Sequence, residues 1–523
     1  MNGDFSRDSF NPAKHFTRVL MQQGRLQIDA DWNEQISIFW QFWRSFVTDS
    51  VGPHAGPEKD CGFYIAALGD LQKLQVTSEE RRRLQSILGR QGDFLISPGR
   101  YYLDGILCSN GEYLLYSNQR GNPEPIVTNG PPYLIYLDVW ERHITHLEDD
   151  SIREVALNGA DTCTRAKAVW QVRAEPLEGE LPPAIDRRFV EEQWTKIVNN
   201  WQPGNRGRLK ARAKETQEDT APNIVSPESR YRGPENQLYR VQIHNGGTVV
   251  ADSAKNGPTF KWSRDNASNT YGVVLVEGAV VTLDNVRDAG SGLRPGDWVE
   301  IVDDKHGWQN QVDPPPLLQV EKVDRGRSQI TLKTQSGYPF DKHSHPVLVR
   351  WDQKAGDPRK GDTELYHGAA LIREEAGDRF WLTLEDGVQI QFENSDPPNT
   401  YRTGDYWLIP ARTATGDVEW PQNTANRTPS RRMALSTTML RWPLLSLRAT
   451  SLAIRQIAAT SSSGIVLTQT CLTVEKSGLH AKDTSDQLVL LPGVGGSGNH
   501  NQRFFCSRNS LIAGSSARPM ARS

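Results

Sequence analysis

Large hydrophobic side chains recur at steps of three and four residues between positions 32 and 46, which is the period of one helix face. We call them the aromatic stripe: Trp32, Ile36, Phe39, Trp40, Trp43 and Phe46. Asp31 with Glu34 predicts a capping box at the start of this helix, and Gly52-Pro53 predicts its end. The pattern therefore predicts an amphipathic helix with a heavy aromatic face.

The aromatic stripe predicts an assembly interface, because it carries more apolar surface than one face of a short helical segment usually buries. The alternative is a helix that packs on its own domain, as most amphipathic helices do. Each large apolar side chain contributes roughly 1.5 to 3 kcal/mol when it is buried. Six such side chains can dominate an interface.

From about residue 94 the pattern changes to β-branched and aromatic runs bounded by Gly and Pro, which predicts strands. The chain is expected to be mainly β with a helical N-terminal element. Five parts are predicted: a helical assembly element (1–60), a β-rich domain with a short helix (61–180), a helix and charged linker or arm (181–236), a β-rich domain of two small barrel or sandwich modules (237–425), and an irregular tail (426–523).

Two further helices follow from local signals. Thr77 with Glu80 predicts a capping box for a helix over 78–88, and helical spacing returns over 185–201. The charged stretch 202–236 is predicted to be a linker or an extended arm. Its alternating basic residues suggest phosphate contact, but acidic residues follow at once, so nucleic-acid binding is not expected.

Composition narrows the function classes. The 523 residues carry a net charge of only −3, which argues against a dedicated nucleic-acid binder. No apolar run reaches the length of a membrane span and no signal-peptide pattern opens the chain, so a cytoplasmic location is expected. Five scattered cysteines suit neither a disulfide framework nor a zinc site.

Candidate chemistry is sparse, and we predict no catalytic, cofactor-binding or metal-binding residues and no enzymatic activity. His343 and His345 suggest a zinc pair, but flanking prolines favour an exposed turn. Acidic doublets such as Asp303-Asp304 are expected to be solvated turns. The aromatic pairs 101–102 and 406–407 are expected in cores rather than on a sugar-binding face. Residues 493–498 match a dinucleotide fingerprint, but no helix follows.

The segment 426–523 differs in kind from the rest of the chain. It holds three acidic residues against twelve Arg and Lys, and the alternation of the strands disappears. When Arg432–Pro443 is back-translated and read from the third base of the Arg432 codon, permissible codons give a different peptide. That peptide resembles the segment that follows Trp420-Pro421 in the family whose opening this chain resembles. We predict a frameshift between about residues 421 and 431, with a genuinely divergent tail as the alternative, and expect a disordered tail.

Residues 22–34 resemble the opening of an uncharacterised family encoded beside phage-tail-like contractile injection systems, and a similar pattern opens phage baseplate proteins. Further similar motifs begin at Ser97, Tyr136, Asp161, Trp170, Glu235, Phe260 and Gly404, so the resemblance covers about residues 1–425. It implies a structural baseplate component whose partners are baseplate or tail proteins of the same particle. A homotrimer is expected, mainly by this analogy. The alternative is a glycan-binding or glycan-cleaving tail protein.

Overall fold

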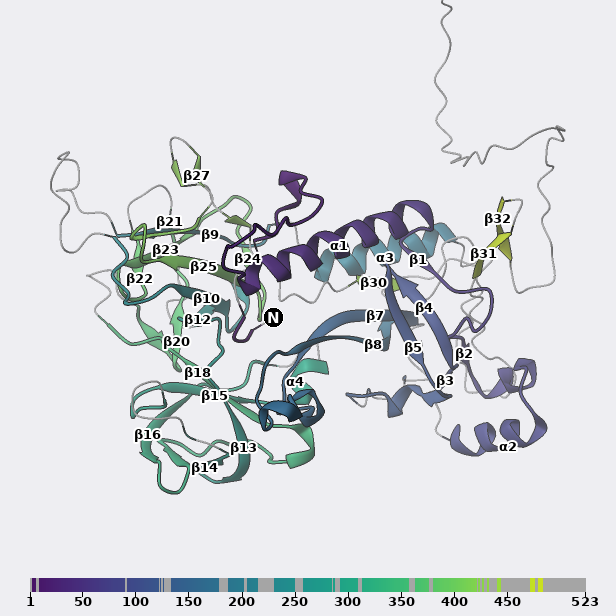
Figure 1. Ribbon diagram of the computed structural model, residues 1–523. Helices are drawn as coiled ribbons and strands as arrows, with labels where there is room; N and C mark the ends of the chain where they lie inside the picture. The colour runs from purple at the N-terminus through teal and green to yellow at the C-terminus, as the bar shows by residue number, and fades with distance from the viewer. Residues whose placement is uncertain are drawn as a thin grey trace, which may run out of the picture. The chain divides into compact units, whose positions relative to one another are not determined.

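The computed structural model describes residues 2–420 together with short strands between 422 and 482. Within 2–420 the described chain has gaps at 6–8, 90–91, 122, 124–125, 127–132, 178–186, 202–204, 215–229, 250–256, 285, 287–291, 309–312, 357–362 and 376–379. As expected, the protein is mainly β, with a long helix near its beginning and several separate sheets (Figure 1).

The first long helix, α1 (Asp29–Ser50), covers the expected positions but starts earlier than the capping box required. Its N-cap is Ile28, which provides no side-chain hydrogen bond. Glu34 instead accepts a hydrogen bond from Ser9 Oγ at 2.5 Å. The capping-box prediction for Asp31 and Glu34 was therefore wrong, because Glu34 is engaged by the segment that precedes the helix.

The first β-rich domain is built around a long hairpin and two small sheets. The hairpin pairs β7 (Tyr133–Ile144) with β8 (Arg165–Pro176). One small sheet comprises β1 (His54–Ala55), β4 (Gly99–Leu103) and β5 (Ile106–Asn110). The other comprises β2 (Ile65–Ala66), β3 (Leu95–Ile96) and β6 (Leu114–Leu115). The short helix α2 (Ser78–Ile87) begins as predicted, because the Thr77 side chain accepts from the Glu80 N–H.

Helix α3 (Arg187–Trp201) packs its apolar face on strand β7. Val190 and Trp194 are buried there against Leu134 and Tyr136. The ring centroids of Tyr136 and Trp194 lie 5.4 Å apart. The helix predicted over 185–201 is thus confirmed in the described part of the chain, and its aromatic face is used inside the protein.

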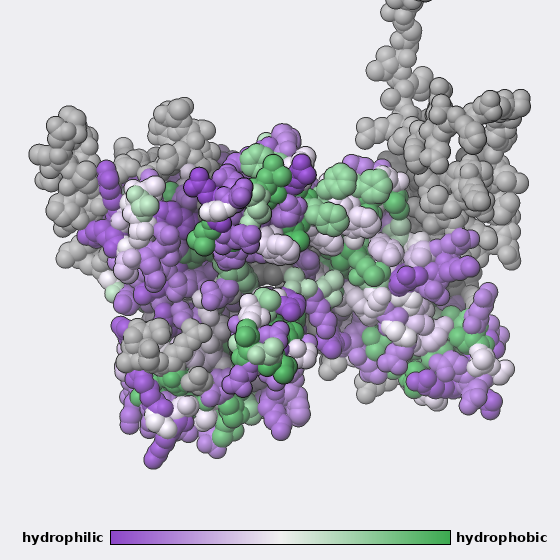
Figure 2. Space-filling view, in the orientation of Figure 1, coloured by the Kyte–Doolittle hydropathy of each residue, from purple (hydrophilic) through white to green (hydrophobic). Residues whose placement is uncertain are grey.

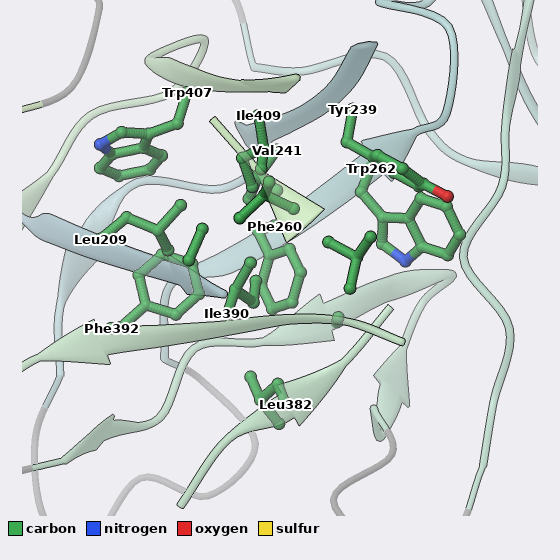
Figure 3. Close-up of a cluster of buried hydrophobic side chains, with 14 of the residues drawn as sticks. Leu209, Tyr239, Val241, Phe260, Trp262, Leu382, Ile390, Phe392, Trp407 and Ile409 are labelled. Carbon is green, nitrogen blue, oxygen red and sulfur yellow. The ribbon is translucent and has the colours of Figure 1, made fainter. Parts of the chain in front are cut away.

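A β-sandwich forms the larger module of the second β-rich region. One sheet has the order β19-β20-β12-β10-β25-β26, and the other β21-β23-β9-β29 with β22 beside β23. The first sheet comprises β10 (Gln237–Ile243), β12 (Thr259–Ser263), β19 (Leu365–Tyr366), β20 (Ala369–Leu371), β25 (Tyr406–Arg412) and β26 (Asp417–Val418). The second sheet comprises β9 (Arg208–Ala213), β21 (Glu374–Glu375), β22 (Leu382–Thr383) and β23 (Val388–Glu393), together with β29. Figure 3 shows side chains of both sheets meeting in one core.

Strand β9 corrects the prediction of a linker over 202–236. Leu209, Ala211 and Ala213 are buried in the sandwich, while the alternate basic residues point away from that core. Lys210 lies 3.6 Å from Glu393, and the Arg212 guanidinium lies over the Trp381 ring. The alternating basic residues are therefore one face of a strand, and two of them are engaged within the protein.

A six-stranded closed barrel is inserted between β12 and β19 of the sandwich. Its strand order is β13-β14-β17-β16-β15-β18. The strands are β13 (Thr270–Glu277), β14 (Val280–Leu283), β15 (Trp298–Val302), β16 (Leu318–Asp324), β17 (Gln329–Leu332) and β18 (Val347–Trp351). The short helix α4 (Asp304–Trp308) follows β15. The barrel and the sandwich are the two module types expected in this region.

The remaining strands are short. β11 (Gly247–Thr248) pairs with β24 (Thr400–Tyr401). In the predicted tail the structure describes only β28 (Asn426–Arg427), β29 (Ser430–Arg431), β30 (Leu440–Pro443), β31 (Cys471–Glu475) and β32 (Gly478–Lys482), with β27 (Gln422–Asn423) just before it. β29 pairs with β9 and β30 pairs with β7. The glycine motif at 493–498 lies outside the described residues.

Candidate assembly surface

Helix α1 contacts the rest of the protein through a narrow face. Ala30 and Ile38 are buried, and Trp40 packs half-buried against the core of the first β-rich domain. Arg44 donates to the Asp104 carbonyl at 3.2 Å and lies 3.5 Å from the Asp104 carboxylate. These contacts fix the helix on the turn between β4 and β5.

The aromatic stripe lies mainly on the opposite face and is exposed. Trp32 is 71% exposed, and Ile36, Phe39, Trp43 and Phe46 are exposed as well. Figure 2 shows hydrophobic residues gathered along the part of the molecule where Figure 1 draws α1. In most amphipathic helices the apolar face packs on the core, whereas the aromatic face of α1 is exposed to solvent.

Two residues differ from their expected places. Trp40 is turned toward the core, because it lies on the flank of α1 that faces the first β-rich domain. Phe42 was not predicted as part of the surface, yet it is 68% exposed. Its positions three residues after Phe39 and four before Phe46 place it beside both on a helix, and this spacing could have revealed it.

Trp43 is exposed but anchored at one end. Its indole N–H donates to the Gly105 carbonyl at 3.3 Å. A Cβ at Gly105 would lie 3.3 Å from the same indole nitrogen, and Gly105 has a φ of +79°. The glycine therefore allows the turn to approach the helix closely, and the Trp43 ring is held in one place on the surface.

The segment before α1, residues 11–28, is a second exposed apolar surface, which we call the arm. Phe16, Leu20, Met21, Leu26 and Ile28 are all exposed, and Leu26 reaches 87%. Apart from the short 3₁₀ turn Pro12–Lys14, the arm has no helix or strand. Its backbone touches α1 where the Val19 N–H donates to Gln35 Oε1 at 2.8 Å.

The exposed apolar area has the size of a protein interface. At about 200 Å² for a large aromatic side chain, the exposed fractions of the five aromatic residues leave roughly 600 Å² uncovered on α1. The arm brings the total to roughly 1,000 Å². Monomeric proteins rarely expose a contiguous apolar patch of more than about 300 to 600 Å². A stable interface buries about 800 Å² on each partner.

A separate polar cluster has the side-chain types of a metal centre. Ligand atoms of Glu148, Asp304 and His345 lie within 4.8 Å of one another. Arg142, however, contacts Glu148 at 2.9 Å and Asp304 at 2.7 Å, so a guanidinium already supplies the positive charge. Burial raises the pKa of Glu148, while Arg142 lowers it and Asp304 raises it further. The cluster is best described as a salt-bridge network that ties the loop after β7 to the barrel.

The expected turn at the two histidines is confirmed, but the neighbouring acidic doublet was misjudged. His343 is exposed at a 3₁₀ turn, and His345 contacts Asp304 at 2.8 Å. Asp303 is buried rather than solvated. Its carboxylate accepts from the Tyr338 hydroxyl and the His306 backbone N–H, and it lies 2.7 Å from His306 Nδ1. Although burial alone raises it, these hydrogen bonds lower the pKa of Asp303 to about 2.

The aromatic pairs weighed as sugar-binding platforms lie in cores instead. Tyr101, Tyr406 and Trp407 are buried, and Tyr102 is half-buried. A cavity of about 460 Å³ lies elsewhere, beside the start of β15. Trp298, Gln319, Lys354 and His367 contribute to its lining. No carboxylate is among the described residues that line this cavity.

Fold and surface together define a multidomain, mainly β protein that presents an exposed apolar arm and helix. The chain belongs to a family of unknown function, DUF6519, which matches residues 1–178 and 188–446. The match extends beyond the expected boundary at residue 425, and the frameshift stays a prediction. Comparisons with curated proteins and with solved structures found no match. None of the described helices is long and apolar enough to cross a membrane.

Proposed function

We propose that this protein is a structural component that assembles through the aromatic stripe and the arm. The observation that carries the proposal is the outward direction of the stripe on a helix that is itself firmly anchored. Arg44 and Trp43 hold α1 on the β4–β5 turn, so its aromatic face is presented as a rigid surface. Rigid, exposed aromatic residues are the usual anchors of protein interfaces.

The setting we propose is the baseplate of a phage-tail-like contractile injection system. This part of the proposal rests on the sequence resemblance described above. In that setting the protein is a non-catalytic part of the particle, its partners are baseplate or tail proteins, and it self-associates as a homotrimer. The particle is assembled in the cytoplasm.

A protein partner is favoured over a lipid surface by the charges of α1. Helices that lie on membranes usually carry Lys and Arg on their polar face. Here Arg44 is the helix's only basic residue and is paired with Asp104, whereas four residues of the helix are acidic. Anionic lipid headgroups would therefore repel this helix, while a protein surface can complement it.

The experiment is a particle-incorporation assay with matched variants. We expect the double variant Trp32→Ser and Phe39→Ser to be lost from particles purified from the native locus, with the β domains still folded. The control is Val155→Ser with Leu157→Ser, which removes two exposed apolar side chains from a loop far from α1 in the sequence. Normal incorporation of the stripe variant would overturn the proposal.

A second candidate function is glycan binding at the cavity beside β15. It is supported by the lining of this cavity of about 460 Å³, which combines the Trp298 ring with the polar side chains of Gln319, Lys354 and His367. An aromatic ring flanked by hydrogen-bonding groups suits a sugar. Binding to a polysaccharide panel that disappears with His367→Ala and Gln319→Ala, in a chain that remains folded, would favour this candidate.

A further inference from the structure

We propose that the arm of one copy docks on the aromatic stripe of a second copy, so that copies join head to tail by exchanging arms. This inference rests on the proposed function and names the partner of the same surface. Both halves of the contact are exposed in a single copy: Leu20 and Leu26 on the arm, Phe39 and Phe42 on α1. Among the described residues, nothing covers this apolar segment of the arm or this apolar surface of α1.

The charges of the two halves are complementary. The arm carries Lys14, Arg18 and Arg25 and no acidic residue. Helix α1 carries four acidic residues, Asp29, Asp31, Glu34 and Asp49, and one basic residue, Arg44, which is already paired. An arm is therefore attracted to α1, whereas two α1 helices laid against each other bring like charges together.

The acidic residues also lie beside the stripe. At 100° per residue, Asp31 and Asp49 fall on the same flank of α1 as Phe42, along one edge of the exposed face. This edge runs over most of the helix, which is roughly 33 Å long at 1.5 Å per residue. The arm can span it, because an extended chain covers about 3.3 Å per residue. Basic residues spaced along the arm can thus pair with acidic residues at both ends of the stripe.

The arm of the same chain leaves the stripe open. Its described contacts with α1 are at the beginning of the helix, where Val19 donates to Gln35, while Ser9, just before the arm, donates to Glu34. Beyond this contact Ile36, Phe39, Trp43 and Phe46 remain exposed, whereas Trp40 packs inward. A second arm can therefore occupy this part of the helix without displacing the contact at Gln35.

The geometry of exchange fits a closed ring. A head-to-tail contact uses two different surfaces of each copy, so every copy gives one arm and receives one. Each contact covers roughly 600 Å² of stripe on one copy and roughly 400 Å² of arm on the other, so a copy with two contacts buries roughly 1,000 Å² of apolar surface in total. Three copies joined in this way give the homotrimer without leaving any arm or stripe uncovered.

The test is charge reversal on the full chain. One variant reverses the arm (Lys14→Glu, Arg18→Glu, Arg25→Glu), and the other reverses the helix (Asp31→Lys, Asp49→Lys). We expect each variant alone to associate at least tenfold more weakly than the original chain, as measured by light scattering. A third variant that carries both sets of reversals should recover association, because every reversed arm then meets a reversed helix in all three contacts of the ring. Circular dichroism checks that all three variants fold.

Three results would overturn arm exchange. They are an oligomer that persists in the arm-reversed variant, a folded variant with both sets of reversals that stays monomeric, and an original chain that is monomeric at micromolar concentration. Particle incorporation separates this failure from failure of the proposed function. If the charge-reversed variants enter particles normally while Trp32→Ser with Phe39→Ser does not, assembly through the stripe stands and exchange is wrong. If all variants enter normally, both proposals are wrong.

Discussion

Helices α1 and α3 carry similar aromatic faces and use them in opposite ways. In α3, Trp194 is only 9% exposed and packs with Trp201 against Tyr136 on strand β7. In α1, the corresponding rings face solvent, and the helix is held through Arg44 and Trp43. An aromatic period therefore identifies a helix face, but whether the chain itself covers that face is decided by the rest of the fold.

The difference follows from what each helix meets. Strand β7 offers α3 the apolar side chains Leu134 and Tyr136, so the aromatic face of α3 is covered within the chain. The β4–β5 turn offers α1 the carbonyl groups of Asp104 and Gly105, which suit the polar ends of Arg44 and Trp43. Helix α1 is thus docked by these hydrogen bonds and by a narrow apolar face, and its aromatic face stays exposed.

The largest expected effect separates the two helices by stability. Trp194→Ala should lower the free energy of unfolding by about 3 to 5 kcal/mol, because a buried ring is lost from a packed site. Phe39→Ala should change it by less than about 0.5 kcal/mol under conditions where the chain is unassociated. Denaturant unfolding measures both. Equal losses for the two substitutions would show that α1 is buried within its own chain.

Changes of pH should affect the stability of the sandwich, which contains Glu385, but not the burial of the aromatic stripe. Burial, with Asp352 and Asp386 nearby, raises the pKa of Glu385 to about 7, although Arg264 opposes the shift. A raised carboxyl pKa means that the folded chain binds the proton more tightly, so stability is present at pH 4 and is lost as the pH rises through 7.

We therefore expect Glu385→Gln to raise the free energy of unfolding at pH 8 by about 1 to 2 kcal/mol, relative to its effect at pH 4, after screening is allowed for. Association through the stripe should not follow the titration of Glu385, because the stripe rings do not titrate. Thermal unfolding and light scattering at several pH values check both statements. A stabilisation by Glu385→Gln that does not depend on pH would contradict the raised pKa of Glu385.

Trp40 tests the boundary between the two faces of α1. Because it is half-buried against the first β-rich domain, Trp40→Ala should cost about 1 to 2 kcal/mol of stability, less than a fully buried ring. Self-association should be retained when the variant is folded. Loss of association without loss of stability would place Trp40 on the exposed face after all.

The smallest expected effect concerns the helix starts. Thr77→Ala removes the cap of α2 and should cost about 1 kcal/mol. The start of α1 has Ile28 at the N-cap, so Ile28→Ser should stabilise the unassociated chain by about 0.5 to 1 kcal/mol while it removes an apolar side chain from the arm. Unfolding curves at low protein concentration compare the two. A destabilising Ile28→Ser would mean that the arm is already docked.

Much of the fold could be predicted from the sequence. The short strands between Gly and Pro indicated the barrel and the sandwich, and Thr77 indicated the start of α2. Strand β9 was missed because its basic residues suggested a charged linker. The residues that alternate with them are Leu209, Ala211 and Ala213, and two of these are too small to give a strong hydrophobic signal. Alternation at period two was the better signal.

The candidate site was predictable only in part. The period of α1 indicated five of the exposed positions, yet Trp40 has the same period and faces the core. A helical wheel ranks positions around an axis but does not say which flank touches a neighbour. The anchors on Asp104 and Gly105 come from a turn about 60 residues later, and no local pattern links them to the helix.

Light scattering of the full chain over a range of micromolar concentrations tests the central claim most directly. The original chain and the control Val155→Ser with Leu157→Ser should form the same oligomer, expected to be a trimer. The variant Trp32→Ser with Phe39→Ser should be a folded monomer. Identical masses for the original chain and the stripe variant at every concentration would contradict the claim that the exposed face of α1 is a self-assembly interface.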